Sequence, residues 1–197
     1  MNLQPGFFIF LIGLLSFLLL HSVRIIAPGW RQAKITAWGE QRYKGIYSLL
    51  SIATFILLIW GYGQARMAPS LVWVPPAGLK HLAALLTLPA FIFLIAAYVP
   101  NNHIKAKLKH PMVLGIKLWA LAHLLIGMWL HSILLFAGFL VWAVLDFRSA
   151  RRRAEQPAAS APQLSATLIA LVVGIAAWAG FALYAHAKLI GVAPFGM

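Results

Sequence analysis

The segment LWALAHLLIGMWLHSILLFAGFLVWAVL, residues 118–145, decides the fold because it contains no Asp, Glu, Lys or Arg. A single membrane span needs about 20 apolar residues, so this segment is too long for one span and short for two. Extending it back to Pro111 and on to Phe147 gives room for two short helices, joined by a turn near Gly127–Ser132.

The basic residues on either side of this segment favour two crossings over one. Lysines precede the segment and arginines follow it: Lys105, Lys107, Lys109, Arg148, Arg151, Arg152 and Arg153. Lys and Arg concentrate in the cytoplasmic loops of membrane proteins, so both clusters are expected on that side. The chain between them must then cross the membrane an even number of times, which predicts a helical hairpin.

The composition of the whole chain requires lipid as a solvent. The chain is 62% hydrophobic and 10% charged, whereas a soluble domain is about 45–50% apolar and about 25% charged. Further segments without charged residues are Leu3–Val23, Gly45–Ala65, His81–Ile104 and Leu164–Ala187. We therefore expect an all-α polytopic membrane helix bundle with six transmembrane helices, over residues 5–27, 44–63, 77–100, 111–129, 131–147 and 164–190.

The distribution of Lys and Arg also predicts the orientation of the chain. The first loop carries a cluster of cations: Arg24, Arg31, Lys34, Arg42 and Lys44. The opposite side carries only Arg66, Lys80 and Lys188. Because the odd-numbered loops are all basic, both termini are expected on the outer, periplasmic side of a bacterial inner membrane.

The first apolar segment lacks the basic n-region of a signal peptide, and its Lys and Arg follow the apolar run. We therefore interpret it as a retained helix. We expect one membrane domain over residues 1–197, with a Pro/Ala/Ser-rich linker at residues 154–163 before the last helix. The formal net charge of +13 does not indicate nucleic-acid binding, because the basic residues lie in short clusters between apolar segments.

The composition excludes several kinds of chemistry. The chain has no cysteine, which excludes disulfides, thiolate catalysis, thiolate-ligated iron–sulfur clusters, thiolate-ligated haem and covalent haem attachment through a C-x-x-C-H motif. Its only carboxylates are Glu40, Asp146 and Glu155, too few for a carboxylate metal cage or a paired-acid hydrolase. Histidine is therefore the main remaining source of ligand chemistry.

Position along the chain separates the seven histidines into two groups. At the outer ends of helices or in the basic third loop, facing solvent or lipid headgroups, we expect His81, His131, His186, His103 and His110. The pair His110-Pro111 also suits the start of a helix. His21 and His123 lie within apolar sequence, and an ionisable group inside a membrane span is a functional candidate by default.

Depth in the membrane supports a joint role for His21 and His123. His21 lies about 9 Å from the inner end of its helix, at 1.5 Å per residue. His123 is about 18 Å from Pro111 on the same scale, but the two depths become similar if the Lys117 side chain extends to the inner headgroups. Two neutral imidazoles at similar depth suit the two axial faces of a b-type haem, with Arg24 and Lys117 pairing with its propionates.

Other interpretations of these two histidines remain open. Each could be a neutral imidazole that is hydrogen-bonded to a carbonyl or hydroxyl of a neighbouring helix. Zinc takes three or four ligands, and no third deep ligand is evident unless His186 or His81 lies deeper than expected. A proton relay normally uses Asp or Glu within the spans, and the apolar segments contain neither.

Several motifs resemble the NnrU family of membrane proteins, which includes the plant 15-cis-zeta-carotene isomerase. The most specific part is His110-Pro111-Met112 followed by Lys117, Trp119-Ala120 and Ala122-His123. Further matching pieces are His21-Ser22, Gly39-Glu40, Tyr43-Lys44-Gly45, Tyr47-Ser48, Trp60-Gly61, Phe139-Leu140-Val141-Trp142 and Asp146. The similarity runs from about residue 7 to residue 153.

The resemblance implies a cofactor and two kinds of process. NnrU proteins are associated with denitrification, in particular with nitrite and nitric oxide reduction. The plant relatives isomerise a cis double bond of a polyene and carry a b-type haem. Their histidine ligands match His21 and His123 here, with His110 as the other motif histidine. We therefore expect haem b with His21 and His123 as axial ligands, in a pocket lined by Trp119 and Ser22.

The resemblance leaves two classes of function. A haem-dependent isomerase would act on a hydrophobic polyene dissolved in the bilayer. A non-catalytic assembly or partner protein for respiratory or denitrification complexes would use the histidines only for packing. A transporter or channel is disfavoured, because the sequence shows no inverted repeat and no charged residue within the apolar segments.

Overall fold

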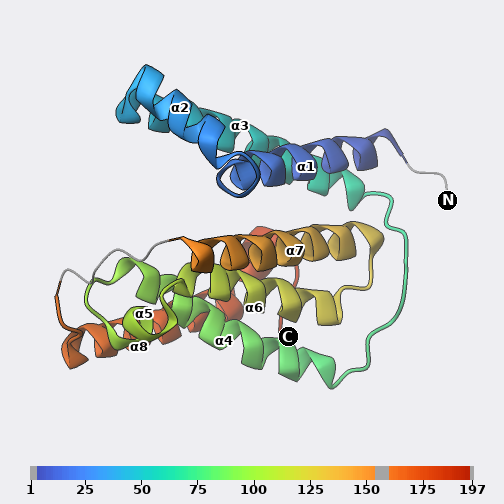
Figure 1. Cartoon of the computed structure of the whole chain (residues 1–197). Coiled ribbons are helices and arrows are strands. Elements are labelled where there is room, and N and C mark those ends of the chain that lie inside the picture. Colours follow the sequence, from blue (N-terminus) through green and yellow to red (C-terminus); the bar gives the residue numbers. More distant parts are fainter. Residues whose placement is uncertain (1–3, 154–159, 196–197) are drawn as a thin grey trace. The chain divides into compact units, whose positions relative to one another are not determined.

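The helical pattern of the sequence is confirmed by a computed structural model, which describes residues 4–153 and 160–195. Within these residues, every regular element is a helix apart from one isolated β-bridge. Figure 1 shows them in chain order: α1 (Pro5–Ile26), α2 (Pro28–Trp38), α3 (Glu40–Ala65), α4 (Leu79–Tyr98), α5 (His103–Leu108), α6 (Pro111–Ile126), α7 (Leu130–Arg152), α8 (Leu164–Gly180), the π-helical turn η1 (Phe181–Ala185) and α9 (His186–Ile190).

Within the described residues, five helical segments are long and apolar enough to cross a membrane: α1, α3, α4, α7 and the continuous segment Leu164–Ile190 that joins α8, η1 and α9. The chain is therefore a polytopic helical membrane protein, with its apolar helices embedded in a lipid bilayer. α6 is apolar as well, but at 1.5 Å per residue it spans about 24 Å, less than the hydrocarbon core of about 30 Å. The helix expected over residues 111–129 ends early, at Ile126.

Two short helices lie where the sequence analysis expects only basic loops. α2 begins at Pro28, whose fixed φ and missing N–H suit the first turn of a helix. It ends before Gly39, whose φ of 81° interrupts the helix. α5 begins after Asn102, whose side-chain oxygen accepts a hydrogen bond from the Lys105 N–H at 2.7 Å. Neither segment is long or apolar enough to be recognised as a span.

Charged residues extend two helices beyond their apolar segments. α3 begins at Glu40 rather than at residue 44, because an acidic side chain in the first turn is favourable. The Glu40 carboxylate also pairs with Lys44 Nζ at 2.7 Å. α7 continues to Arg152 rather than ending at residue 147, and its last turn contains cations that complement the helix dipole.

The contacts between helices divide the chain into two compact units. Unit 1 contains Met1–Val74 and Met128–Gly138, and unit 2 contains Pro75–Gly127 and Phe139–Met197. The division falls within α7, so the beginning of that helix belongs to unit 1 and the remainder to unit 2.

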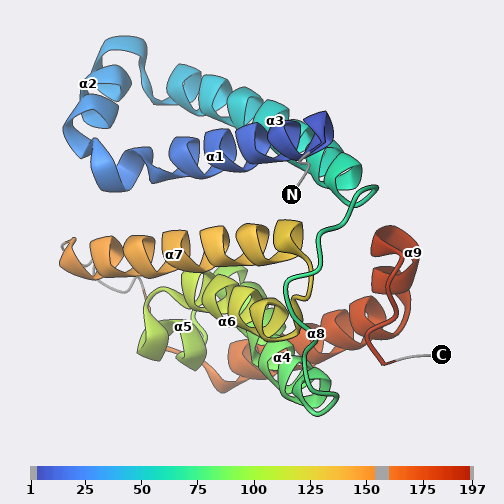
Figure 2. The ribbon, with the colours of Figure 1, turned by 90° about the vertical axis from the view of Figure 1, so that its right-hand side faces the viewer.

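In unit 1, α1 and α3 form an antiparallel pair that lies side by side in Figures 1 and 2. Two glycines allow the two backbones to approach closely. A Cβ added to Gly13 would lie 2.7 Å from Leu58 Cα, and one added to Gly61 would lie 2.5 Å from Phe10 N. Small residues at such positions allow membrane helices to pack by direct backbone contact, and Phe10 is completely buried in this contact.

The segment after α3 is hydrogen-bonded to the turn between α6 and α7. The Val72 N–H donates to Met128 O at 2.9 Å, and the Leu130 N–H donates to Ser70 O at 2.9 Å. The turn expected near Gly127–Ser132 is therefore confirmed, since the connection between the two helices lies there.

In unit 2, α4 packs against both α6 and α8. A Cβ on Gly115 of α6 would lie 2.8 Å from Ala90 O, and one on Gly174 of α8 would lie 2.7 Å from Ile92 Cα. Both neighbours belong to α4, so glycines again set the helix spacing. The arrangement fixes α6, the helix that carries His123.

The linker expected at residues 154–163 lies partly outside the described residues, which include only its last part, 160–163. That part is not helical. The Gln163 N–H donates to Asn101 O at 2.7 Å, which connects the start of α8 to the segment before α5.

Candidate functional site

His21 belongs to unit 1 and lies near the end of α1. Its Nδ1 is 2.8 Å from Phe17 O. A carbonyl oxygen only accepts, so Nδ1 carries the proton and the lone pair of the neutral ring lies on Nε2. The ring stacks on Phe17 at 4.1 Å and meets the edge of Tyr47 of α3 at 5.7 Å. One turn beyond Tyr47, the Ser51 hydroxyl is buried and makes no hydrogen bond with a described residue.

His123 belongs to unit 2 and repeats the local arrangement of His21 in the last turn of α6. Its Nδ1 is 2.8 Å from Trp119 O, which again places the lone pair of the neutral ring on Nε2. The rings of Trp119 and His123 are 5.4 Å apart, and Trp119 packs perpendicular to Phe139 of α7 at 5.5 Å. Trp119 therefore contacts the histidine beside which it was expected.

The two histidines thus share one tautomer, imposed by the carbonyl four residues earlier on the same helix. A ligating histidine usually donates its other ring N–H to a carbonyl or carboxylate, which fixes the ring and raises its basicity. This hydrogen bond is compatible with a purely structural imidazole as well, although the partner is the helix's own backbone rather than a neighbouring helix. The hydrogen bond at Nδ1 therefore does not by itself distinguish a haem ligand from a structural imidazole.

The other expected site residues lie on the same two helices. In unit 1 the Ser22 hydroxyl donates to Leu18 O at 2.7 Å, and Arg24 is exposed in the last turn of α1. In unit 2 Lys117 Nζ lies 4.7 Å from the centre of the Phe147 ring. The cations expected to pair with propionates therefore each lie within two turns of a candidate histidine on its own helix.

His110 occupies the position immediately before α6. Its backbone carbonyl accepts from the Leu114 N–H at 3.2 Å, and its ring meets the edge of Phe147 at 6.3 Å. These contacts fit the interpretation of His110-Pro111 as a helix start.

His186 lies beside His123, which the sequence analysis considered only for the case that His186 lay deeper than expected. We expected it to face headgroups, but its ring lies 6.3 Å from that of His123, with 23° between the ring planes. Its Nδ1 is 2.6 Å from Val192 O, so this imidazole also has the lone pair of its neutral form on Nε2. The π-helical turn Phe181–Ala185 directly precedes it. Such turns change which face of a helix the following side chains occupy, and no pattern in the sequence indicates one here.

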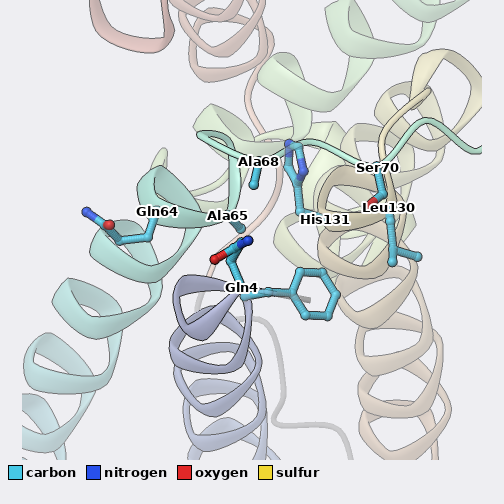
Figure 3. A pocket seen from close by; sticks show the side chains of 8 residues that line it. Gln4, Gln64, Ala65, Ala68, Ser70, Leu130 and His131 are labelled. Carbon is cyan, nitrogen blue, oxygen red and sulfur yellow. The ribbon is translucent and has the colours of Figure 1, made fainter. Parts of the chain in front are cut away.

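His131 also differs from expectation, because it is buried in unit 1 with only 4% of its surface exposed. Its ring meets the edge of Tyr62 at 5.2 Å. It lines a small cavity together with Gln4, Phe7, Gln64, Ala65, Ala68, Ser70 and Leu130, as Figure 3 shows. The cavity has about 10 Å³ of free space, which is room for one water molecule. It cannot hold a porphyrin or a polyene.

The remaining histidines are exposed, as expected. His81 lies on the surface of α4. His103 begins α5, and its Nδ1 is 2.9 Å from Thr167 Oγ1. Among residues 4–153 and 160–195, no group of three or more His, Cys, Asp or Glu side chains is placed so that it could hold a metal ion.

The family model described as NnrU protein matches residues 9–194, which includes the last helix as well as the motifs around His21 and His123. No curated protein and no solved structure matches the chain.

Proposed function

The chain belongs to the NnrU family, and on this basis we propose that it binds one haem b with His21 and His123 as axial ligands. The supporting observation is the shared tautomer. In both histidines the Nδ1–H donates to a backbone carbonyl at 2.8 Å, which orients the ring and presents Nε2 to iron. A non-covalent b-type haem needs only two such nitrogens and no cysteine.

The residues beside the two ligands have complementary roles in this proposal. Trp119 packs at a tilt against the ligand ring on α6, and the buried Ser51 hydroxyl lies on α3, one turn beyond the Tyr47 that contacts His21. Ser22 lines the site on α1. Arg24 and Lys117 pair with the propionates, because a guanidinium and an ammonium are the natural partners of carboxylates.

Haem held by His21 and His123 would supply redox chemistry and an iron that can coordinate a small molecule or a double bond. We propose that this chemistry serves denitrification at the step of nitrite or nitric oxide reduction, in the inner membrane of a bacterium. Isomerisation of a membrane-soluble polyene is the reaction to which the plant relatives point. That link rests on family analogy, because a fold does not by itself specify a reaction.

The test of haem binding is direct. The full chain is expressed with ample haem, purified in detergent and examined by absorption spectroscopy and the pyridine haemochrome assay. We expect a Soret band and a b-type spectrum, with one haem per chain. A colourless protein would overturn the haem proposal and favour an assembly or partner protein with structural histidines.

We also propose that α6 crosses the membrane, which gives six crossings and places both termini outside. Because the chain has no cysteine, single cysteines report sidedness without background. Lys107 and Ser160 are exposed on either side of the α6–α7 hairpin. We expect Lys107→Cys and Ser160→Cys to react with an impermeant maleimide only after lysis, and Ala68→Cys to react in intact spheroplasts. Labelling of Lys107 and Ser160 from opposite sides would show that α6 does not cross.

A further inference from the structure

We propose that α2 and the start of α3 form a binding site for the headgroups of anionic phospholipids. The site consists of Trp30, Arg31, Lys34, Trp38 and Arg42, which we call the α2 surface. It lies in unit 1 and is independent of haem binding.

The position of α2 restricts it to the boundary of the membrane. The helix connects two candidate spans, with only Ala27 separating it from α1 and only Gly39 separating it from α3. Figure 2 shows α2 across the end of the α1–α3 pair. α2 contacts α1 and α3, but none of its residues is buried, so much of its surface is exposed. Because it joins the ends of two apolar helices directly, its side chains lie at the level of the lipid headgroups.

Aromatic residues and one cation alternate along one side of α2. Trp30, Lys34 and Trp38 follow each other at intervals of one turn, so they share a face. Lys34 Nζ lies 5.8 Å from the centre of the Trp30 ring and 5.0 Å from that of Trp38. Both tryptophans are exposed, by 52% and 38%. Exposed Trp beside Lys is the composition of helices that lie in the interface between water and lipid.

Among the described residues, no salt bridge joins a cation of the α2 surface to a carboxylate. Arg31 lies over the Tyr43 ring at 5.6 Å. Within the described part of the chain, the side chains of Arg31, Lys34 and Arg42 make no ion pair and no hydrogen bond. The nearby carboxylate of Glu40 is paired with Lys44 and interacts with Arg31 only through a weaker, longer-range attraction. An anionic phosphodiester is therefore the complement that this surface lacks.

A lipid fits this surface better than a soluble anion or an acidic protein segment, because the surface presents both aromatic rings and cations at the level of the headgroups. The tryptophan rings suit the boundary between headgroups and acyl chains, and the cations suit the phosphate layer. Each basic residue next to a membrane span raises the affinity for anionic lipids about fivefold.

The experiment compares a double variant with a matched control. The full chain is delipidated in detergent, and its binding of phosphatidylglycerol and of phosphatidylcholine is measured by native mass spectrometry. We expect wild type to prefer phosphatidylglycerol and Arg31→Gln/Lys34→Gln to bind it about 25-fold more weakly, from about fivefold per cation. The control Lys80→Gln/Lys188→Gln removes the same charge elsewhere in the chain, and Lys188 likewise lies over an aromatic ring, that of Tyr184, at 4.5 Å.

Thermal unfolding in phosphatidylcholine verifies that the variants are folded. A further control, Arg31→Lys/Lys34→Arg, keeps the charge and should bind phosphatidylglycerol like wild type. Three results would overturn the proposal: no preference for phosphatidylglycerol in wild type, an unchanged preference in Arg31→Gln/Lys34→Gln, or an equal loss in the control. If the double variant unfolds, Arg42→Gln alone should still weaken binding about fivefold, and unchanged binding by it would count against the site.

Discussion

His123→Ala abolishes the Soret band of the purified protein, and His21→Ala does the same, if both imidazoles ligate haem iron. Each substitution removes the Nε2 lone pair together with the imidazole, and with it the side-chain hydrogen bond to Trp119 O or Phe17 O. Non-covalent haem that loses one of two axial ligands is released readily during purification, since no thioether bond retains it. The measurement is the haem-to-protein ratio from the pyridine haemochrome assay, expected to fall at least tenfold.

His103→Ala is the matched control for these two variants. This substitution also removes an imidazole, but the His103 ring is exposed at the start of α5 and is hydrogen-bonded to the Thr167 hydroxyl. We expect its haem content and spectrum to equal those of wild type. A comparable loss in this variant would show that the assay reports general instability rather than ligation.

His186→Ala separates two ligand assignments, because the His186 ring lies 6.3 Å from His123 within unit 2. With His21 and His123 as ligands, His186→Ala keeps the haem and changes only the surroundings of the His123 ring, seen as a small shift of the Soret maximum. If His186→Ala loses haem and His21→Ala retains it, the proposed pair is wrong and the iron lies between His123 and His186.

The purely structural interpretation makes a different prediction for the same variants. Histidines that only pack would leave wild type colourless, and His21→Ala would lower thermal stability by removing the stack on Phe17 and the contact with Tyr47. Adding haem would not raise the unfolding temperature of wild type. A ligand that binds only the folded protein must raise it, so this comparison distinguishes the two readings even when haem content is low.

Much of the fold follows from the sequence, because apolar length and charge act locally. The turn between α6 and α7 was predicted from a long uncharged segment bounded by cations, and the structure places it at the expected residues. The last helix begins and ends where expected, at residues 164 and 190. α2 was missed because its 11 residues are too short and polar for a span, and its only signals are Pro28 at the start and Gly39 at the end.

The candidate site was less predictable, because it depends on contacts between distant segments. Apolar flanking sequence distinguished His21 and His123 from the other histidines, and the family match includes both. The proximity of His186 to His123 arises from helix packing and a π-helical turn, neither of which hydropathy encodes. His131 is buried for a similar reason, since Tyr62 of α3 covers it.

Gly61→Ala should destabilise unit 1 by about 1–3 kcal/mol, the usual cost of overpacking a close contact. The new Cβ would lie 2.5 Å from Phe10 N and 2.6 Å from Phe10 Cα. Both are backbone atoms of α1, so no side-chain rotation relieves the clash and the two helices must separate. Separation uncovers Phe10, which is fully buried in the pair. Thermal unfolding in detergent, followed by the fluorescence of the eight tryptophans, should show a fall of several degrees.

Gly63→Ala provides the control on the same helix. A Cβ at Gly63 meets nothing within 4 Å, and alanine has a higher helix propensity than glycine, so this variant should be as stable as wild type or slightly more stable. Gly13→Ala enters the same α1–α3 contact, 2.7 Å from Leu58 Cα. Once one substitution has moved the helices apart, the second added Cβ clashes less. The double variant should therefore lose less stability than the sum of the two single losses. Equal stability of Gly61→Ala and Gly63→Ala would show that α1 and α3 do not pack with their backbones in contact.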